Sequence, residues 1–139
     1  MTAEVDLFVY GTLMSESCLY SLTRHYFPRC EAELSGFERI VPSTGYPYII
    51  PKAGAWVQGL LLSGVDPIAL AALDQYESEG VLYHRRRVEV TVGGHRVPCE
   101  TYVGDVEALK AQHGERVTGD QSKGNGQSIP SSRLPLCTS

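Results

Sequence analysis

Apolar residues along this chain gather in short runs that are separated by glycine, proline and polar turns. The first run, "LFVY", predicts a buried strand over residues 5–10, because aromatic and β-branched side chains favour extended backbone. Gly11 interrupts the run, and Ser15 follows as the N-cap of a short helix predicted over residues 16–26. The pattern therefore indicates a strand that leads through a glycine-containing loop into a helix.

Three further strands are predicted before the middle of the chain. Residues 31–41 alternate loosely around a glycine bend. Residues 46–51, "YPYIIP", are short, rich in β-forming side chains and bounded by prolines, which indicates an edge strand. Residues 56–65, "WVQGLLLSGV", complete the set with apolar side chains on both faces.

The clearest helix signal lies between Asp66 and Gly80. Asp66 can serve as the N-cap, and Pro67 suits the first helical position, where its missing N–H has no intrahelical partner to lose. Apolar side chains in "IALAALDQY" then recur at a spacing of four. The helix is predicted to end between Glu77 and Gly80.

A β-hairpin is predicted next, with a strand over residues 83–92, a Gly-Gly turn at 93–94 and a returning strand over 95–103. A short helix is predicted over residues 105–113. Strands outnumber helices and are mostly joined by short turns, so the predicted class is α+β with a mixed or closed sheet.

The length of 139 residues suits one domain, and 42% hydrophobic residues suit a real core. Residues 1–113 are predicted to form this domain. Residues 114–139 are rich in Gly, Ser, Gln and Pro and lack periodicity, which predicts a flexible tail.

Charge, the N-terminal sequence and the cysteines bear on which partners, which location and which metal sites are expected. The net charge of −4 gives no electrostatic support for binding nucleic acid or an anionic membrane. The N-terminal residues show no basic segment followed by a long apolar run, so no signal peptide is predicted and a cytoplasmic location is expected. The four cysteines are widely and irregularly spaced, which favours reduced thiols and argues against a zinc site.

Glu77, in "LDQYESEG", is the first candidate for chemistry. A carboxylate at a helix C-terminus faces the negative end of the helix dipole, and Asp74 and Glu79 add like charges. Both effects favour the protonated form and so raise the pKa of the carboxyl group. A raised carboxyl pKa suits a general base that works near neutral pH. The alternative is a solvated helix end with three acids facing water, and the residues alone favour that simpler explanation.

Arg86 is the second candidate. Counting by twos along the predicted strand, it falls in line with Val88, Val90 and Val92, so it is predicted to point toward the apolar side. An arginine there needs an acidic partner, and the acids of residues 74–79 are the nearest in sequence. A structural ion pair is the simpler role; orienting a catalytic acid or a substrate carboxylate is the functional one.

The loop "YGTL" is the third candidate. Gly11, Thr12 and Leu13 offer backbone N–H groups directly after a strand, and Gly11 permits close approach or an unusual φ. Such amides can hold a carboxylate or an oxyanion. By itself, a strand that ends in glycine indicates only a turn.

Taken in order, these segments resemble the γ-glutamylcyclotransferase-like family. "VYGTLM" resembles the family's N-terminal strand and Y-G-[ST]-L loop, and "GYPYIIP" with "VQGLLL" resembles its central strands. "LDQYE" resembles the L-D-x-x-E segment that holds the family's catalytic glutamate, and "YHRRRVEV" resembles the Y-x-R-x-x-V-x-V strand. "ETYV" fits the strand that follows, so the resemblance covers roughly residues 5–104.

The resemblance implies a compact, barrel-like mixed sheet and a cofactor-independent, metal-free enzyme. In such enzymes the α-amine of a γ-glutamyl group attacks its own γ-carbonyl, giving 5-oxoproline and a freed amine. Glu77 matches the catalytic glutamate, Gly11, Thr12 and Leu13 would hold the α-carboxylate, and Tyr10 and Arg86 are further substrate-binding candidates. The assignment requires the loop amides and Glu77 to border one cavity.

Alternatives of other classes stay open at this point. The same pocket can serve a non-catalytic domain that binds a small carboxylate, or the fold alone can serve as an interaction module. The chain has Ser78, Glu79 and then Gly80 where family members often have glycine directly after the glutamate. The expected partner is a small γ-glutamyl compound of undetermined leaving group, and the expected state is a monomer or weak homodimer.

Overall fold

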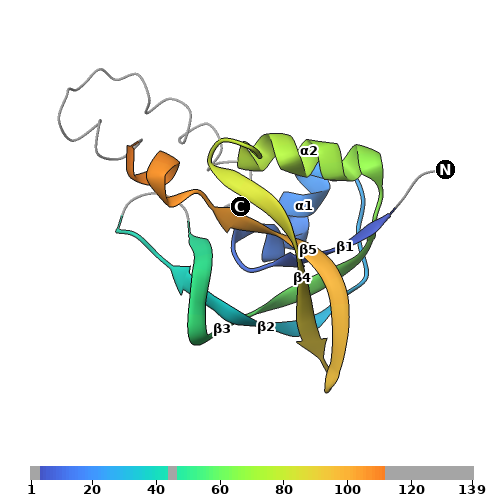
Figure 1. Cartoon of the computed structure of the whole chain (residues 1–139). Helices are drawn as coiled ribbons and strands as arrows, with labels where there is room; N and C mark the ends of the chain where they lie inside the picture. Colours follow the sequence, from blue (N-terminus) through green and yellow to red (C-terminus); the bar gives the residue numbers. More distant parts are fainter. Residues whose placement is uncertain (1–3, 44–46, 112–139) are drawn as a thin grey trace.

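A computed structural model describes residues 4–43 and 47–111 of the chain. Its helices and strands follow the predicted order closely (Figure 1). The elements are β1 (Val5–Val9), η1 (Thr12–Met14), α1 (Glu16–Thr23), β2 (Arg29–Ile40), β3 (Tyr48–Val65), α2 (Pro67–Glu77), β4 (Tyr83–Val92) and β5 (His95–Gly104). A further helical segment covers residues 106–111, within the predicted range. The tail predicted over 114–139 lies outside the described residues.

The five strands form a closed barrel in the order β1-β3-β2-β4-β5. Closure joins β1 to β5 in parallel, with Leu7 opposite Glu100 and Phe8 opposite Thr101. The other neighbouring pairs are antiparallel. The Thr101 hydroxyl, which is fully buried, donates to the carbonyl of Phe8 at 2.9 Å and adds a side-chain bond across this seam. The predicted α+β class with a compact barrel-like mixed sheet is confirmed.

The strands predicted separately at 46–51 and 56–65 are one long strand, β3. Opposite β2, Trp56 pairs with Ser35 and Pro51 pairs with Phe37, so the residues between them bulge out of the ladder. Gly54 lies in this bulge with φ of +84°, a conformation that favours glycine. The break that the sequence indicated is therefore a bulge within one continuous strand.

The buried side chains form two clusters that meet at β1. The barrel-interior cluster comes only from strands and consists of Phe8, Tyr10, Ala32, Leu34, Ile49, Val57, Leu61, Val90, Cys99 and Val103. The helix-side cluster lies between the barrel and its helices and consists of Leu7, Val9, Leu13, Cys18, Leu19, Phe27, Leu62, Val65, Ala69, Leu70, Leu73, Tyr76, Tyr83 and Tyr102. Successive strand residues point to opposite faces, so β1 is buried on both. This double burial explains why residues 7–9 are all apolar.

The two α-helices lie together on one side of the barrel (Figure 1). Ser15 caps α1 through its hydroxyl, which accepts from the amide of Cys18 at 3.2 Å. Asp66 caps α2 in the same way, accepting from Ala69 at 2.8 Å, and Pro67 occupies the first turn as predicted. None of the helices in the described ranges is long and apolar enough to cross a membrane.

The two cysteines of the sheet match the expectation of reduced thiols. Cys30 and Cys99 are free. Burial raises the pKa of the Cys99 thiol to about 12, so it stays protonated inside the barrel.

Candidate active site

A small cavity of about 30 Å³ lies where the end of β1 meets the end of α2. On one side it is lined by the continuous run of residues 8–13. On the other side it is lined by Tyr76 and Glu77 of α2, and Tyr83, Tyr102 and Pro47 complete the wall. The loop and the glutamate, some sixty residues apart in sequence, therefore share one cavity, as the sequence required.

The loop after β1 is a tight helical turn. The amide of Met14 donates to the carbonyl of Gly11 at 2.9 Å, and the amide of Ser15 donates to Thr12 at 3.1 Å. The first N–H groups of a helical turn have no acceptor within that turn. The backbone amides of Gly11, Thr12 and Leu13 are thus of the kind that can donate hydrogen bonds to an anion bound at the cavity wall.

Gly11 does not use the left-handed conformation that the sequence suggested as one option, since its φ is −134°. A Cβ atom added at this position would meet only the Pro47 side chain, at 3.9 Å. Pro47 lines the same cavity. Glycine at this position therefore leaves the space beside Pro47 open.

Side-chain contacts fix the loop at both ends. The Arg29 guanidinium, at the start of β2, donates through Nη1 to the carbonyl of Met14 at 2.7 Å. The hydroxyl groups of Thr12 and Tyr76 lie 3.4 Å apart and connect the loop to α2. Because Arg29 is 23% exposed, the first of these contacts is largely sheltered from water. The cavity wall is thus tied to both the barrel and α2.

Tyr10 lies at the barrel end of the cavity with 7% of its surface exposed. Its hydroxyl donates to the carbonyl of Tyr102 at 2.6 Å, which ties β1 to β5. Burial and then the nearby charge of Glu77 raise the pKa of Tyr10 well above its usual value. Tyr10 therefore stays protonated, with its donor occupied.

Glu77 is the last residue of α2 and is half-buried at the cavity wall. The helix ends because Ser78 adopts the left-handed conformation, with φ of 55°. The amide of Glu79 then donates to the carbonyl of Asp74 at 2.9 Å and closes the last turn. This cap fixes the direction in which Glu77 leaves the helix.

The prediction for Arg86 is wrong in its geometry. Arg86 is exposed and is not among the cavity-lining residues. Its neighbour Arg85 pairs with the acids, donating through Nη1 to Asp74 and through Nε to Glu100 at 2.6 Å. The alternation argument assumed one apolar face, whereas the first residues of β4 are covered on their other face by α2, where Tyr83 is buried in the helix-side cluster.

Sequence reasoning also missed three of the four tyrosines that line the cavity, namely Tyr76, Tyr83 and Tyr102. The Tyr83 hydroxyl donates to the carbonyl of Pro47 at 3.1 Å, and the Tyr102 hydroxyl donates to Asp74 at 2.6 Å. Burial, and then the bond to Asp74, raise the pKa of Tyr102 well above its usual range. Tyrosine combines an apolar ring with a polar tip, and that signal could have marked these positions.

The described residues offer no group of three or more His, Cys, Asp or Glu side chains placed to hold a metal ion. Glu77 carries the one carboxyl group among the described side chains that line the cavity. The arrangement therefore combines one carboxylate, a loop of backbone amides and a wall of tyrosines. Such a set can exchange protons with a bound amine and can hold an anionic group.

The family model described as gamma-glutamyl cyclotransferase, AIG2-like matches residues 7–122. AIG2-like protein C of Arabidopsis thaliana is 38% identical over 104 residues, covering 73% of this chain and 59% of that protein. AIG2-like protein D of the same plant is 32% identical over 102 residues, covering 70% and 66%. The chain thus spans about three fifths to two thirds of the length of these curated relatives.

The fold is similar to that of several solved structures. A solution structure from Arabidopsis thaliana has a TM-score of 0.67 at 23% identity, covering 96% of this chain and 78% of that one. A structure named gamma-glutamyl cyclotransferase has a TM-score of 0.63 at 18% identity, covering 93% and 99%. A crystal structure of an AIG2-like protein from Mus musculus has a TM-score of 0.61 at 22% identity, covering 88% and 98%. At these identities the likeness shows the fold alone.

Proposed function

The chain belongs to the gamma-glutamyl cyclotransferase, AIG2-like family, and we propose that it cyclises a γ-glutamyl amine or γ-glutamyl amino acid to 5-oxoproline with release of the amine. One observation carries the proposal. The loop of residues 10–13 and the carboxylate of Glu77 line the same cavity. The cyclisation needs a group that holds an anion and a base at one place. The positions of the loop and Glu77 support this reaction.

The chemistry assigns Glu77 the proton transfers. The attacking α-amine arrives as an ammonium ion, and Glu77 takes a proton from it. The α-nitrogen then bonds to the γ-carbonyl carbon as that carbon's bond to the leaving nitrogen breaks. Glu77 returns this proton to the leaving nitrogen, which departs as an amine. Glu77 then takes the second proton from the α-nitrogen, which keeps one hydrogen in 5-oxoproline, and passes it to the freed amine, which leaves as an ammonium ion. No covalent enzyme intermediate and no cofactor enters this scheme.

The loop has the positioning role. The amides of Gly11, Thr12 and Leu13 would hold the α-carboxylate of the substrate, which fixes the α-amine against the γ-carbonyl. Ring closure is intramolecular, so holding this geometry can supply much of the rate. We place the reaction in the cytoplasm, with a small γ-glutamyl compound as the partner and a monomer or weak homodimer as the working state.

The test is turnover by the purified chain on a panel of γ-glutamyl amines and γ-glutamyl dipeptides, read as 5-oxoproline formed. Glu77→Gln keeps the shape and removes the base, so kcat should fall by about 10²–10⁴-fold. Glu33→Gln is the matched control, because Glu33 is an exposed glutamate of β2 that is not among the cavity-lining residues.

Equal turnover by Glu77→Gln and the unsubstituted chain would contradict the role of Glu77. If no panel member reacts but 5-oxoproline or another small acid raises the melting temperature, the non-catalytic binding role is supported in its place. The panel also identifies the leaving group, since every member presents the same γ-glutamyl end.

A further inference from the structure

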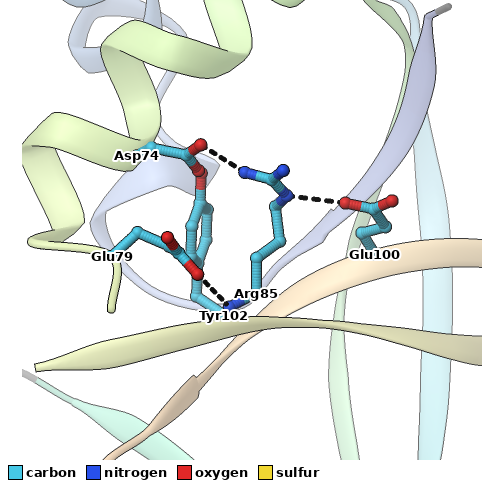
Figure 2. Close-up of polar contacts among 5 residues, drawn as sticks. All are labelled: Asp74, Glu79, Arg85, Glu100 and Tyr102. Carbon is cyan, nitrogen blue, oxygen red and sulfur yellow. Dashed lines mark hydrogen bonds and ion pairs between the residues drawn. The ribbon is translucent and has the colours of Figure 1, made fainter. Parts of the chain in front are cut away.

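Five polar side chains meet at the end of α2, beside the cavity (Figure 2). This charged cluster consists of Asp74, Glu79, Arg85, Glu100 and Tyr102. The Arg85 guanidinium donates to Asp74 and, through Nε, to Glu100 at 2.6 Å. The hydrogen bond to Asp74 raises the pKa of Arg85 above its usual value, so the guanidinium stays charged. One arginine therefore holds two carboxylates from different elements.

Asp74 uses both oxygens of its carboxylate in this cluster. Oδ2 accepts from Arg85, and Oδ1 accepts from the Tyr102 hydroxyl at 2.6 Å. Arg85 and Tyr102 lie directly opposite one another on β4 and β5. The side chain of Asp74 thus fixes α2 to both strands of the hairpin. Tyr102 also lines the cavity, so the cluster extends to the cavity wall.

Arg85 contacts the chain on both sides of Glu77. Its guanidinium binds Asp74, three residues before Glu77, and its backbone amide donates to Glu79 Oε2 at 3.2 Å, two residues after it. Between these contacts, the amide of Glu79 donates to the carbonyl of Asp74 at 2.9 Å. The turn that carries Glu77 is therefore closed on itself and anchored to β4.

We propose that Arg85 is a positioning residue that fixes the carboxylate of Glu77 against the loop of residues 11–13. The expected effect of Arg85 on catalysis rests on the proposed function. Arg85 does not line the cavity, so it acts through the backbone on either side of Glu77. A displacement of about 1 Å can cost about 10²-fold in rate when reacting groups must be aligned.

Arginine suits this position better than lysine. The guanidinium presents several N–H groups in a fixed plane, so it can bind Asp74 and Glu100 in set directions at once. A lysine would keep the charge but would present it at a single point. Arg85→Lys is therefore expected to keep part of the side-chain anchoring and Arg85→Gln to lose it, while the backbone contact to Glu79 remains in both.

The first experiment separates kcat from KM. Arg85→Gln should lower kcat by about 10- to 100-fold, with KM close to that of the unsubstituted chain, because the loop that holds the substrate carboxylate is untouched. Arg85→Lys should give an intermediate kcat. Arg87→Gln is the matched control, because Arg87 is an exposed arginine on the same face of the same strand and should leave both constants unchanged.

A double-mutant cycle tests whether Arg85 acts through Glu77. Adding Arg85→Gln to Glu77→Gln should cause no further loss of kcat, because the group being positioned is already absent. An equal loss in both backgrounds would assign Arg85 to general stability and overturn the inference. If Arg85→Gln does not fold, Arg85→Lys serves in the same cycle.

A measurement without substrate separates this inference from the proposed function. Amide hydrogen exchange at Ser78 and Glu79 should be faster in Arg85→Gln than in Arg87→Gln, because those amides close the anchored turn. If no member of the γ-glutamyl panel reacts, the proposed function fails, while the exchange result still shows whether Arg85 fixes the turn. If Arg85→Gln changes neither amide exchange nor kcat, the inference about Arg85 is overturned and the proposed function is unaffected.

Discussion

The barrel-interior cluster and the helix-side cluster are both well buried, but they differ in what else they contain. The barrel-interior cluster is built from strand side chains, and the Tyr10 hydroxyl at its edge is hydrogen-bonded. The helix-side cluster includes three tyrosines that line the cavity, and the charged cluster around Arg85 borders it. The first cluster reaches the cavity through Phe8 and Tyr10, whereas the second also packs the helix that carries Glu77.

The largest effect that tests this difference comes from two matched leucines. Leu34 of β2 and Leu73 of α2 are almost completely buried, one in each cluster. Each change to alanine should lower the free energy of unfolding by about 2–5 kcal/mol, through lost burial and the cavity created. Leu73→Ala should also lower kcat, because it loosens the helix that carries Glu77, whereas Leu34→Ala should leave kcat unchanged.

Denaturant unfolding measures the first quantity, and 5-oxoproline formation at a temperature where both variants are folded measures the second. Loss of kcat in Leu34→Ala equal to that in Leu73→Ala would show that the two clusters do not differ in this way.

Two glycines give the next largest contrast. A Cβ at Gly59, in β3, would lie 2.7 Å from the Phe8 ring and against the Val9 carbonyl, so Gly59→Ala overpacks the barrel. It should lower the free energy of unfolding by about 1–3 kcal/mol or more. A Cβ at Gly11 meets only Pro47, so Gly11→Ala should keep its stability but raise KM, because its methyl group occupies the cavity.

Thermal unfolding and Michaelis constants for both alanine variants check this pair. A destabilised Gly11→Ala with an unchanged KM would remove the distinction between a glycine required by packing and one that leaves room for a ligand.

The smallest effect is expected at the outer edge of the helix side, where His84 Nε2 lies 2.8 Å from Asp105 Oδ2. The hydrogen bond from His84 lowers the pKa of Asp105 below its ordinary value of 3.8. A depressed carboxyl pKa contributes stability that is present above that ordinary value and is lost as the pH falls through the folded-state pKa. Asp105→Asn should therefore unfold at a slightly lower temperature near pH 6, and the difference should vanish in acid.

Asparagine caps helices about as well as aspartate, so this substitution removes the charge and retains the cap that Asp105 provides to Ala108. Glu107→Gln, an exposed neighbour in the same helical segment, is the control and should show no such pH dependence. A difference between Asp105→Asn and the unsubstituted chain that persists after Asp105 is protonated in the folded state would contradict the assignment.

Local signals were sufficient for much of the fold. The cap at Asp66 and Pro67 predicted where α2 begins, and the alternation of residues 83–92 predicted β4 to its exact bounds. The continuity of β3 was missed because two proline-bounded runs read as separate strands, and only pairing with β2 shows that they join. Strand order and barrel closure depend on contacts distant in sequence, which no local pattern encodes.

The candidate site was predictable in part. The loop and Glu77 were found by their resemblance to family motifs, and the structure places them around one cavity. The arginine was misplaced by one residue because the alternation rule ignored the layer formed by α2, although the Y-x-R pattern already pointed to Arg85. The lining tyrosines come from three elements, so only the folded chain brings them together.

Closure of the barrel through β1 and β5 has a kinetic consequence. Tyr10 and Tyr102 are 92 positions apart, and their hydrogen bond forms only when the first and last strands meet. Bringing such distant segments together carries a loop-closure entropy, so this step belongs late in folding and sets a slow pace for it. A chain still emerging from the ribosome has the loop and Glu77 long before it has the fifth strand. The wall of the cavity is therefore assembled together with the native state, and refolding chains should regain activity in step with that final pairing.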